Sequence, residues 1–184
     1  MTSEENPNAA AGVAAANPFT VADVAGILRE RGWLIGEPSA EQAAWCEQAA
    51  ALLGPQAKDR EALGELLGLV FHYDASELMA NVETHVVLSR YAARDVLRQL
   101  ALLLLDGVPL TSERFKEIVT ALKEDLELRG RDLFHPIRLA LAGRAGEGEL
   151  DRVILLLDDA AVLSFGVPVK TVRERILEFC AALD

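Results

Sequence analysis

Residues 129–144, RGRDLFHPIRLALAGR, decide how the C-terminal half of this chain folds. Proline suits a first helical turn, and glycine suits the left-handed position after a last turn. The spacing therefore predicts a short helix of about two turns, with Pro136 in its first turn and Gly143 just beyond its end. Arg138 would then project from the first turn. There, unpaired amides and the helix dipole favour an anionic or acceptor-rich ligand.

The segments on either side also read as helices. Thr111 or Ser112 can cap a helix that runs through Leu128, a Leu-rich helix follows residues 146–150, and a last helix spans residues 171–183. Carboxylates at helix N-termini are typical caps and dipole partners. The acidic pairs at 147/149 and 158/159 therefore indicate helix starts rather than a general acid and base.

The N-terminal half predicts a flexible tail followed by helices. Residues 1–18 have no apolar period, which is typical of a flexible tail. Capping pairs at Thr20 with Asp23 and at Ser39 with Gln42 begin two helices, and a third covers residues 60–70. Residues 76–105 are then predicted to form one long segment. Within it, residues 86–105 are expected to form a central helix that is buried on more than one side.

Composition favours an all-α fold. Hydrophobic residues make up 51% of the chain but aromatic residues only 5%, and Leu and Ala dominate. The loop at residues 106–110 contains Gly107 and Pro109 and coincides with a change in charge. We therefore predict a two-subdomain helical bundle with an N-terminal subdomain at 19–110 and a C-terminal subdomain at 111–184.

The charge distribution restricts where RNA could bind. The net charge of −11 has the wrong sign for a protein that coats nucleic acid non-specifically. Residues 1–110 contain 7 basic and 15 acidic side chains, whereas residues 111–184 contain 11 and 14. Any RNA contact is therefore expected to be local and to lie in the second half.

The sequence offers few groups for catalysis or metal binding. Cys46 and Cys180 lie in apolar helical patterns without a C-x-x-C motif, which indicates buried free thiols. His72, His85 and His135 are scattered and form no ligand set. No metal or cofactor is implied. Without a secretory signal or a long apolar run, we expect a cytoplasmic protein with no membrane partner.

Residues 129–144 resemble the stretch that opens the C-terminal anticodon-binding subdomain of bacterial glutamyl-tRNA synthetases. The similarity extends nearly without gaps over residues 112–157, and residues 59–74 are similar to an upstream family segment that is about one residue longer. The resemblance implies a two-part α-helical cage whose C-terminal part holds the splayed anticodon bases. It also implies glutamate-type tRNA as a partner.

The resemblance implies a set of RNA-binding residues. Arg138 falls on the arginine that contacts an anticodon base in the family, and His135 and Leu150 fall on neighbouring base-pocket positions. Phosphate contacts are expected from Arg144, Arg131 and Arg129, and a weaker RNA contact from Arg60. The chain departs from the family where EGEL, residues 147–150, replaces Gly-Pro-Glu-Leu, and again beyond Leu157.

The chain lacks the H-x-G-H and Lys-Met-Ser-Lys-Ser-like motifs of class I synthetases, so we expect no aminoacylation by this chain alone. The resemblance therefore implies a stand-alone module that recognises tRNA or modulates its charging in trans. One alternative is a helical protein-interaction module, homodimeric or bound to another protein, that has lost RNA binding. A further alternative is a structural partner of a separate synthetase catalytic subunit.

Overall fold

The computed structural model describes residues 17–184, and in that range it contains helices and no strand. The predicted all-α fold is confirmed. The helices are α1 (Val21–Glu30), α2 (Ala40–Leu53), the 3₁₀ helix η1 (Gly54–Gln56), α3 (Arg60–Phe71), α4 (Ala75–Met79), α5 (Val82–Leu88), α6 (Ala93–Leu104), α7 (Ser112–Leu126), α8 (Arg131–Ala142), α9 (Glu149–Ala161) and α10 (Val172–Leu183).

The predicted flexible tail lies mostly outside the described residues. Its structure is described only from residue 17, where the Asn17 side chain donates to the carbonyl of Ala50 in α2. Asn17 also accepts a hydrogen bond from the amide of Phe19 at 3.0 Å. The tail boundary at residue 18 stays a prediction, although Asn17 already contacts α2.

Three helix starts follow the caps predicted from sequence. Thr20 with Asp23 and Ser39 with Gln42 both form complete capping boxes. At α7 the cap is Thr111, whose side chain accepts from the amide of Arg114 at 3.1 Å. These side chains satisfy backbone donors that the first helical turn leaves unpaired. Hydrogen bonds to these capping side chains therefore fix where α1, α2 and α7 begin.

The predicted continuous segment at 76–105 is wrong, because α4, α5 and α6 are separate helices. Asn81 accepts a hydrogen bond from the amide of Glu83 and starts α5. Ala92 adopts a left-handed backbone with φ of 60° and redirects the chain before α6. Tyr91, which lies in the part expected to be a buried central helix, is 85% exposed. Within that part, α6 buries Val96, Leu97, Leu100 and Leu104.

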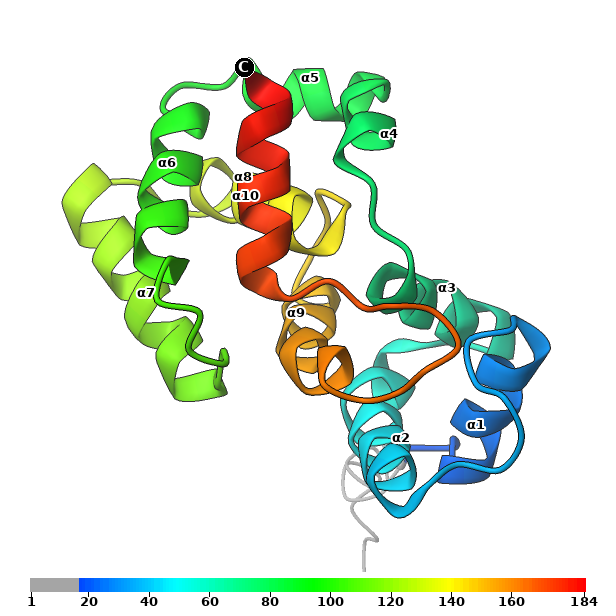
Figure 1. The fold of residues 1–184 in the computed structure, drawn as a ribbon. Coiled ribbons are helices and arrows are strands. Elements are labelled where there is room, and N and C mark those ends of the chain that lie inside the picture. Colours follow the sequence, from blue (N-terminus) through cyan, green and yellow to red (C-terminus); the bar gives the residue numbers. More distant parts are fainter. Residues whose placement is uncertain (1–16) are drawn as a thin grey trace, which may run out of the picture.

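The helices form two groups with α9 between them (Figure 1). Helices α1 to α3 lie at one end, whereas α4 to α8 and α10 lie at the other. Helix α9 packs against α2 and α3 on one side and against α8 and α10 on the other. The division at residue 110 stays a prediction. The two predicted halves share one hydrophobic core.

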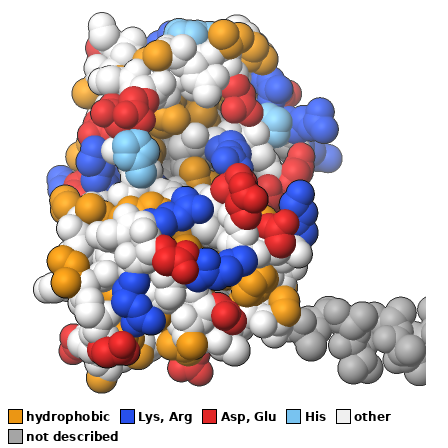
Figure 2. Space-filling view, turned by 90° about the vertical axis from the view of Figure 1, so that its right-hand side faces the viewer, with side chains coloured by type: hydrophobic (Ala, Val, Ile, Leu, Met, Phe, Trp, Pro, Cys, Tyr) orange, Lys and Arg blue, Asp and Glu red, His pale blue; other side chains and the backbone are white. Residues whose placement is uncertain are grey.

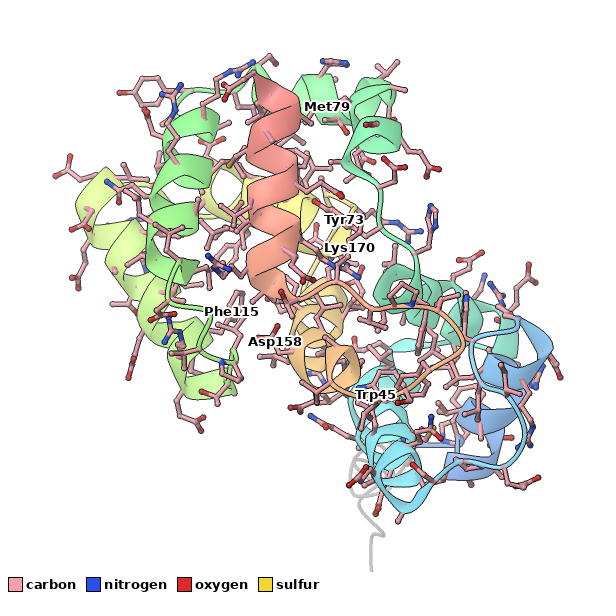
Figure 3. The ribbon with its side chains drawn as sticks, viewed as in Figure 1. Trp45, Tyr73, Met79, Phe115, Asp158 and Lys170 are labelled. Carbon is pink, nitrogen blue, oxygen red and sulfur yellow. The ribbon has the colours of Figure 1, made fainter. Side chains whose placement is uncertain are left out.

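Arg175 joins the two groups from inside this core. Its side chain is fully buried and donates to the carbonyls of Leu69, Val70 and Leu141, at 2.9, 2.7 and 3.0 Å. The guanidinium also lies 4.7 Å from the centre of the Tyr73 ring, and Tyr73 lies beside Lys170, which shortly precedes α10 (Figure 3). One arginine therefore caps the C-terminal ends of α3 and α8 together.

Thr84, in α5, carries a buried polar group without a partner. The side chain is fully buried, and among residues 17–184 nothing forms a hydrogen bond with its hydroxyl. Valine has nearly the same shape and no hydroxyl to desolvate. We therefore expect Thr84→Val to raise the free energy of unfolding by about 1 kcal/mol, measured by urea denaturation. A loss of stability would show that the hydroxyl is satisfied in solution.

Two further features complete the fold. Cys46 and Cys180 are both free thiols, as predicted. Cys46 is buried, as expected, whereas Cys180 is only partly buried. In the part of the chain that the structure describes, the helices are too short or too polar for any of them to traverse a bilayer.

Candidate nucleic-acid interface

Helix α8 carries the stretch that the sequence singles out. It begins at Arg131, directly after Gly130, and ends before Gly143, whose φ of 82° confirms the predicted left-handed end. Pro136 was expected in the first turn but lies inside the helix. This is tolerated because a proline removes one backbone donor, and the carbonyl left without it, on Asp132, belongs to an exposed residue. The helix is therefore longer than predicted.

Because the helix begins at Arg131, Arg138 lies beyond the first turn, and its side chain points inward. Its Nε donates to Asp151 Oδ1 at 2.9 Å, its Nη2 to Asp151 Oδ2 at 3.0 Å, and its Nη1 to the carbonyl of Gly146 at 3.0 Å. The guanidinium also lies 4.7 Å from the centre of the Phe134 ring. The side chain is only 10% exposed. The expectation of a free guanidinium in the first turn is therefore wrong.

A groove of about 660 Å³ runs between α7 and the α8–α9 pair. Phe134 and Asp151, the two side chains that hold Arg138, both line it, whereas Arg138 itself does not. Phe115 lies between α7 and α9 (Figure 3) and lines the groove as well. The lining includes three further apolar side chains and two cationic ones: Leu52, Val119, Leu155, Lys116 and Arg152.

His135, three residues before Arg138 on α8, lies beside an arginine from a distant part of the chain. Arg90 Nη1, in the connection between α5 and α6, donates to His135 Nδ1 at 2.7 Å. A guanidinium cannot accept, so Nδ1 is the acceptor and Nε2 carries the proton. Burial lowers the pKa of His135, and the charges of Arg90 and Arg131 lower it further. The imidazole is therefore neutral at neutral pH.

Two other predicted contacts lie elsewhere. Leu150 is completely buried in the core, so it presents no surface to a base. Arg144 is exposed and borders a separate hollow of about 200 Å³, together with the carboxylates of Glu65 and Glu149. The structure therefore does not gather Arg144, Leu150, Arg138 and His135 around one concavity, as the RNA-binding hypothesis anticipated.

Arg129 and Arg60, which were also predicted to contact RNA, lie apart from Arg138 and from each other. Arg129 is exposed and borders a hollow of about 500 Å³ with Lys123, Glu124 and Glu127. Arg60 belongs to α3 and forms a two-pronged ion pair with Glu30 of α1, with N–O distances of 2.7 and 2.8 Å. Arg60 is thus engaged away from α8. The structure brings together Arg131, His135 and Arg138, and adds Arg90, which no local sequence pattern marks.

Acidic side chains near α9 have structural partners. Asp158, labelled in Figure 3, accepts hydrogen bonds from the amides of Leu110 at 2.7 Å and Val172 at 3.0 Å. It therefore anchors the loop before α7 and the start of α10. The predicted helix start at residues 158/159 is wrong, because both residues lie near the C-terminal end of α9. The carboxylate of Asp158 instead binds an amide at the start of another helix, α10.

Among the residues that the structure describes, the face drawn in Figure 2, which includes the α1–α3 end, has no extended basic area. Figure 2 shows this face with Lys and Arg side chains interspersed among Asp and Glu side chains. Mixed charges of this kind leave little net field for a polyanion. The face shown in Figure 2 therefore offers a nucleic acid no continuous basic surface.

Comparison with known proteins gives one consistent result. The family model described as an anticodon binding domain matches residues 13–164. The glutamate–tRNA ligase of Exiguobacterium sibiricum is 28% identical over 137 residues, which cover 74% of this chain and 28% of the ligase. The enzyme of Bacillus subtilis is 28% identical over 130 residues, covering 71% of this chain and 26% of the ligase. No solved structure matches.

The chain thus spans about a quarter of the length of these two ligases. Glutamate–tRNA ligase 2 of Syntrophus aciditrophicus shows a shorter match, 32% identity over 89 residues, covering 48% of this chain and 16% of the ligase. The resemblance to the anticodon-binding region of glutamyl-tRNA synthetases is confirmed. The family model covers most of the chain, and the chain therefore belongs to the anticodon binding domain family.

Proposed function

We propose that this chain binds the anticodon loop of a glutamate-type tRNA and does not itself carry out aminoacylation. It would thereby recognise the tRNA or modulate its charging by a separate synthetase. The match to the anticodon binding domain family and to glutamate–tRNA ligases supports this function. So does the groove beside α8, the part of the chain with the strongest family resemblance.

The single observation that carries the proposal is the wall of this groove. Phe134 presents a partly exposed aromatic ring, and Arg138 lies behind that ring at 4.7 Å from its centre. Unpaired loop bases bind proteins by stacking on aromatic rings. The volume of about 660 Å³ is large enough for a base and its sugar. Lys116 and Arg152 at the lining supply charge for the backbone.

Arg138 takes a different role in this proposal from the one the sequence predicts. Its contacts fix Phe134 and Asp151, which border the groove, so it acts as a positioning residue. Asp151 offers carboxylate oxygens that can accept from an amino group on a base edge. A base would therefore meet an aromatic face and an acceptor, both held in place by one guanidinium.

The substitution Phe134→Leu tests this site. It keeps apolar bulk but removes the aromatic face, and stacking contributes about 1–3 kcal/mol per base. We expect tRNA to bind about tenfold more weakly at low salt, with the salt dependence unchanged because no charge is removed. Fluorescence anisotropy with labelled tRNA measures both quantities.

Phe19→Leu serves as the matched control, because Phe19 is also partly buried but does not line the groove. The Phe19→Leu variant is expected to bind tRNA with the same affinity as the unaltered chain. Equal affinities for Phe134→Leu and Phe19→Leu, with both proteins folded, would exclude the groove as the base site.

A protein-interaction module is a second candidate, and one surface favours it. Helices α6 and α10 pack side by side, and they expose Leu102, Leu105 and Leu177 to the extent of 68, 44 and 38%. Exposed leucines on adjacent helices are typical of a protein interface. A failure to bind tRNA at low salt, together with self-association in sedimentation experiments, would support a homodimeric module instead.

A further inference from the structure

Arg90, Arg131 and His135 converge on one part of the surface beside α8. Arg131 and His135 are four residues apart on the same helix, so their side chains share a face. Arg90 reaches the imidazole from the α5–α6 connection, with 2.7 Å between Nη1 and Nδ1. Because Nδ1 accepts this hydrogen bond, Nε2–H remains as a donor for another group.

The charges at this place are not balanced. Asp151 offsets the charge of Arg138 through two hydrogen bonds. Within residues 17–184, by contrast, neither Arg90 nor Arg131 has a carboxylate oxygen within 4.0 Å. Like charges that lack an ion-pair partner repel one another. In a chain with a net charge of −11, such a local excess of positive charge suits an anionic ligand.

Most of the charged groups that act on His135 are cationic. Arg90 approaches it from the α5–α6 connection, Arg131 and Arg138 from α8, and Glu147 from the α8–α9 connection. Burial and the three arginines lower the pKa of His135, and Glu147 alone among these groups acts in the opposite direction. The N-terminus of α8, which no side chain caps, adds the positive end of its dipole to the same region.

We propose that Arg90, Arg131 and His135 form a phosphate-binding site distinct from the groove beside Phe134. Two guanidinium groups supply planar pairs of donors, which match the geometry of phosphate oxygens, and His135 Nε2–H supplies a further one. The ligand is a phosphate group, either a phosphodiester of RNA or a free phosphate. The site extends the proposed function if the phosphate belongs to RNA, but it does not depend on RNA.

Phosphate binding at this site is coupled to protonation of His135. A bound anion favours the charged imidazolium, so the pKa of His135 is expected to rise when the site is filled. The imidazole signals of His135 in a ¹³C-labelled sample report this directly by NMR. His72 and His85, which contact Glu77 and the carbonyl of Met79, are internal controls.

The first arm of the test titrates inorganic phosphate. We expect the His135 signals to shift with saturation while those of His72 and His85 do not. Arg90→Gln and Arg131→Gln should each weaken phosphate binding about tenfold, the effect of losing one charge-assisted contact. Without ligand, each variant should also raise the pKa of His135, because each removes a charge that lowers it. Arg94→Gln removes an exposed charge from α6 and should change neither quantity.

The second arm replaces phosphate with a short single-stranded RNA that has no terminal phosphate. Shifts of His135 with both ligands, or with RNA alone, assign the site to the RNA backbone. Shifts with inorganic phosphate alone support the site while contradicting RNA as its ligand. If neither ligand moves the His135 signals at tens of millimolar phosphate, or if Arg131→Gln binds as well as the unaltered chain, the proposed site is wrong.

Discussion

Replacing Arg175 with methionine is expected to lower the free energy of unfolding by about 3–5 kcal/mol. Methionine fills much of the apolar volume but donates no hydrogen bond. The carbonyls of Leu69, Val70 and Leu141 would be left in the core without their donor. Each unsatisfied buried acceptor costs about 1–3 kcal/mol. Lysine would not restore these contacts, because its single ammonium group cannot reproduce the planar fork.

Urea denaturation followed by circular dichroism measures this change. Arg173→Met is the control on the same helix, since the Arg173 side chain is exposed and, within residues 17–184, donates only to the carbonyl of Leu105. It should cost less than about 1 kcal/mol. Burial lowers the pKa of Arg175 to about 10, so its guanidinium remains charged at neutral pH. A loss no larger for Arg175→Met than for Arg173→Met would show that water replaces the missing donors.

Trp45→Ala is expected to destabilise the fold by about 3–5 kcal/mol, the usual cost of removing a large aromatic side chain from a core. Trp45 is 3% exposed. Its ring lies 5.6 Å from that of Phe71 and 5.3 Å from that of Phe165, and its indole donates to the carbonyl of Leu156 at 3.1 Å. Alanine would leave both a cavity and an unsatisfied carbonyl.

This substitution also tests how the two ends of the molecule depend on each other. Trp45 belongs to α2 and Leu156 to α9, the helix that lies between the two groups (Figure 1). If they fold as one unit, denaturation of Trp45→Ala gives one transition at lower urea. Two separate transitions would show that α1 to α3 can unfold alone. Tyr91→Ala removes an aromatic ring that is 85% exposed, so it should change stability by less than about 0.5 kcal/mol.

Local signals predicted much of the fold. Thr20, Ser39 and Thr111 cap helices where the sequence indicates, because capping depends on residues three apart. The breaks before α5 and α6 were missed for a different reason. The apolar pattern continues through them, and the left-handed backbone of Ala92 is held by packing rather than by a glycine or proline.

The candidate site was less predictable, because it depends on contacts between helices. Nothing next to Arg138 in the sequence shows that Asp151, thirteen residues later, would pair with it. Arg90 is forty-five residues from His135 and belongs to no motif. The position of Pro136 also misled the prediction, since it suggested a helix start that Gly130 provides instead. The family resemblance identified the correct helix but not the orientation of its side chains.

Competition between tRNAs that differ only in the anticodon tests the central claim most directly. A labelled glutamate-type tRNA is bound to the chain at low salt and displaced with unlabelled tRNA, either unaltered or carrying a replaced anticodon. Recognition of the anticodon loop predicts that the altered tRNA competes at least about tenfold more weakly, as expected when one base contact is lost. Equal competition by both tRNAs, or no binding of either, would contradict anticodon recognition by this chain.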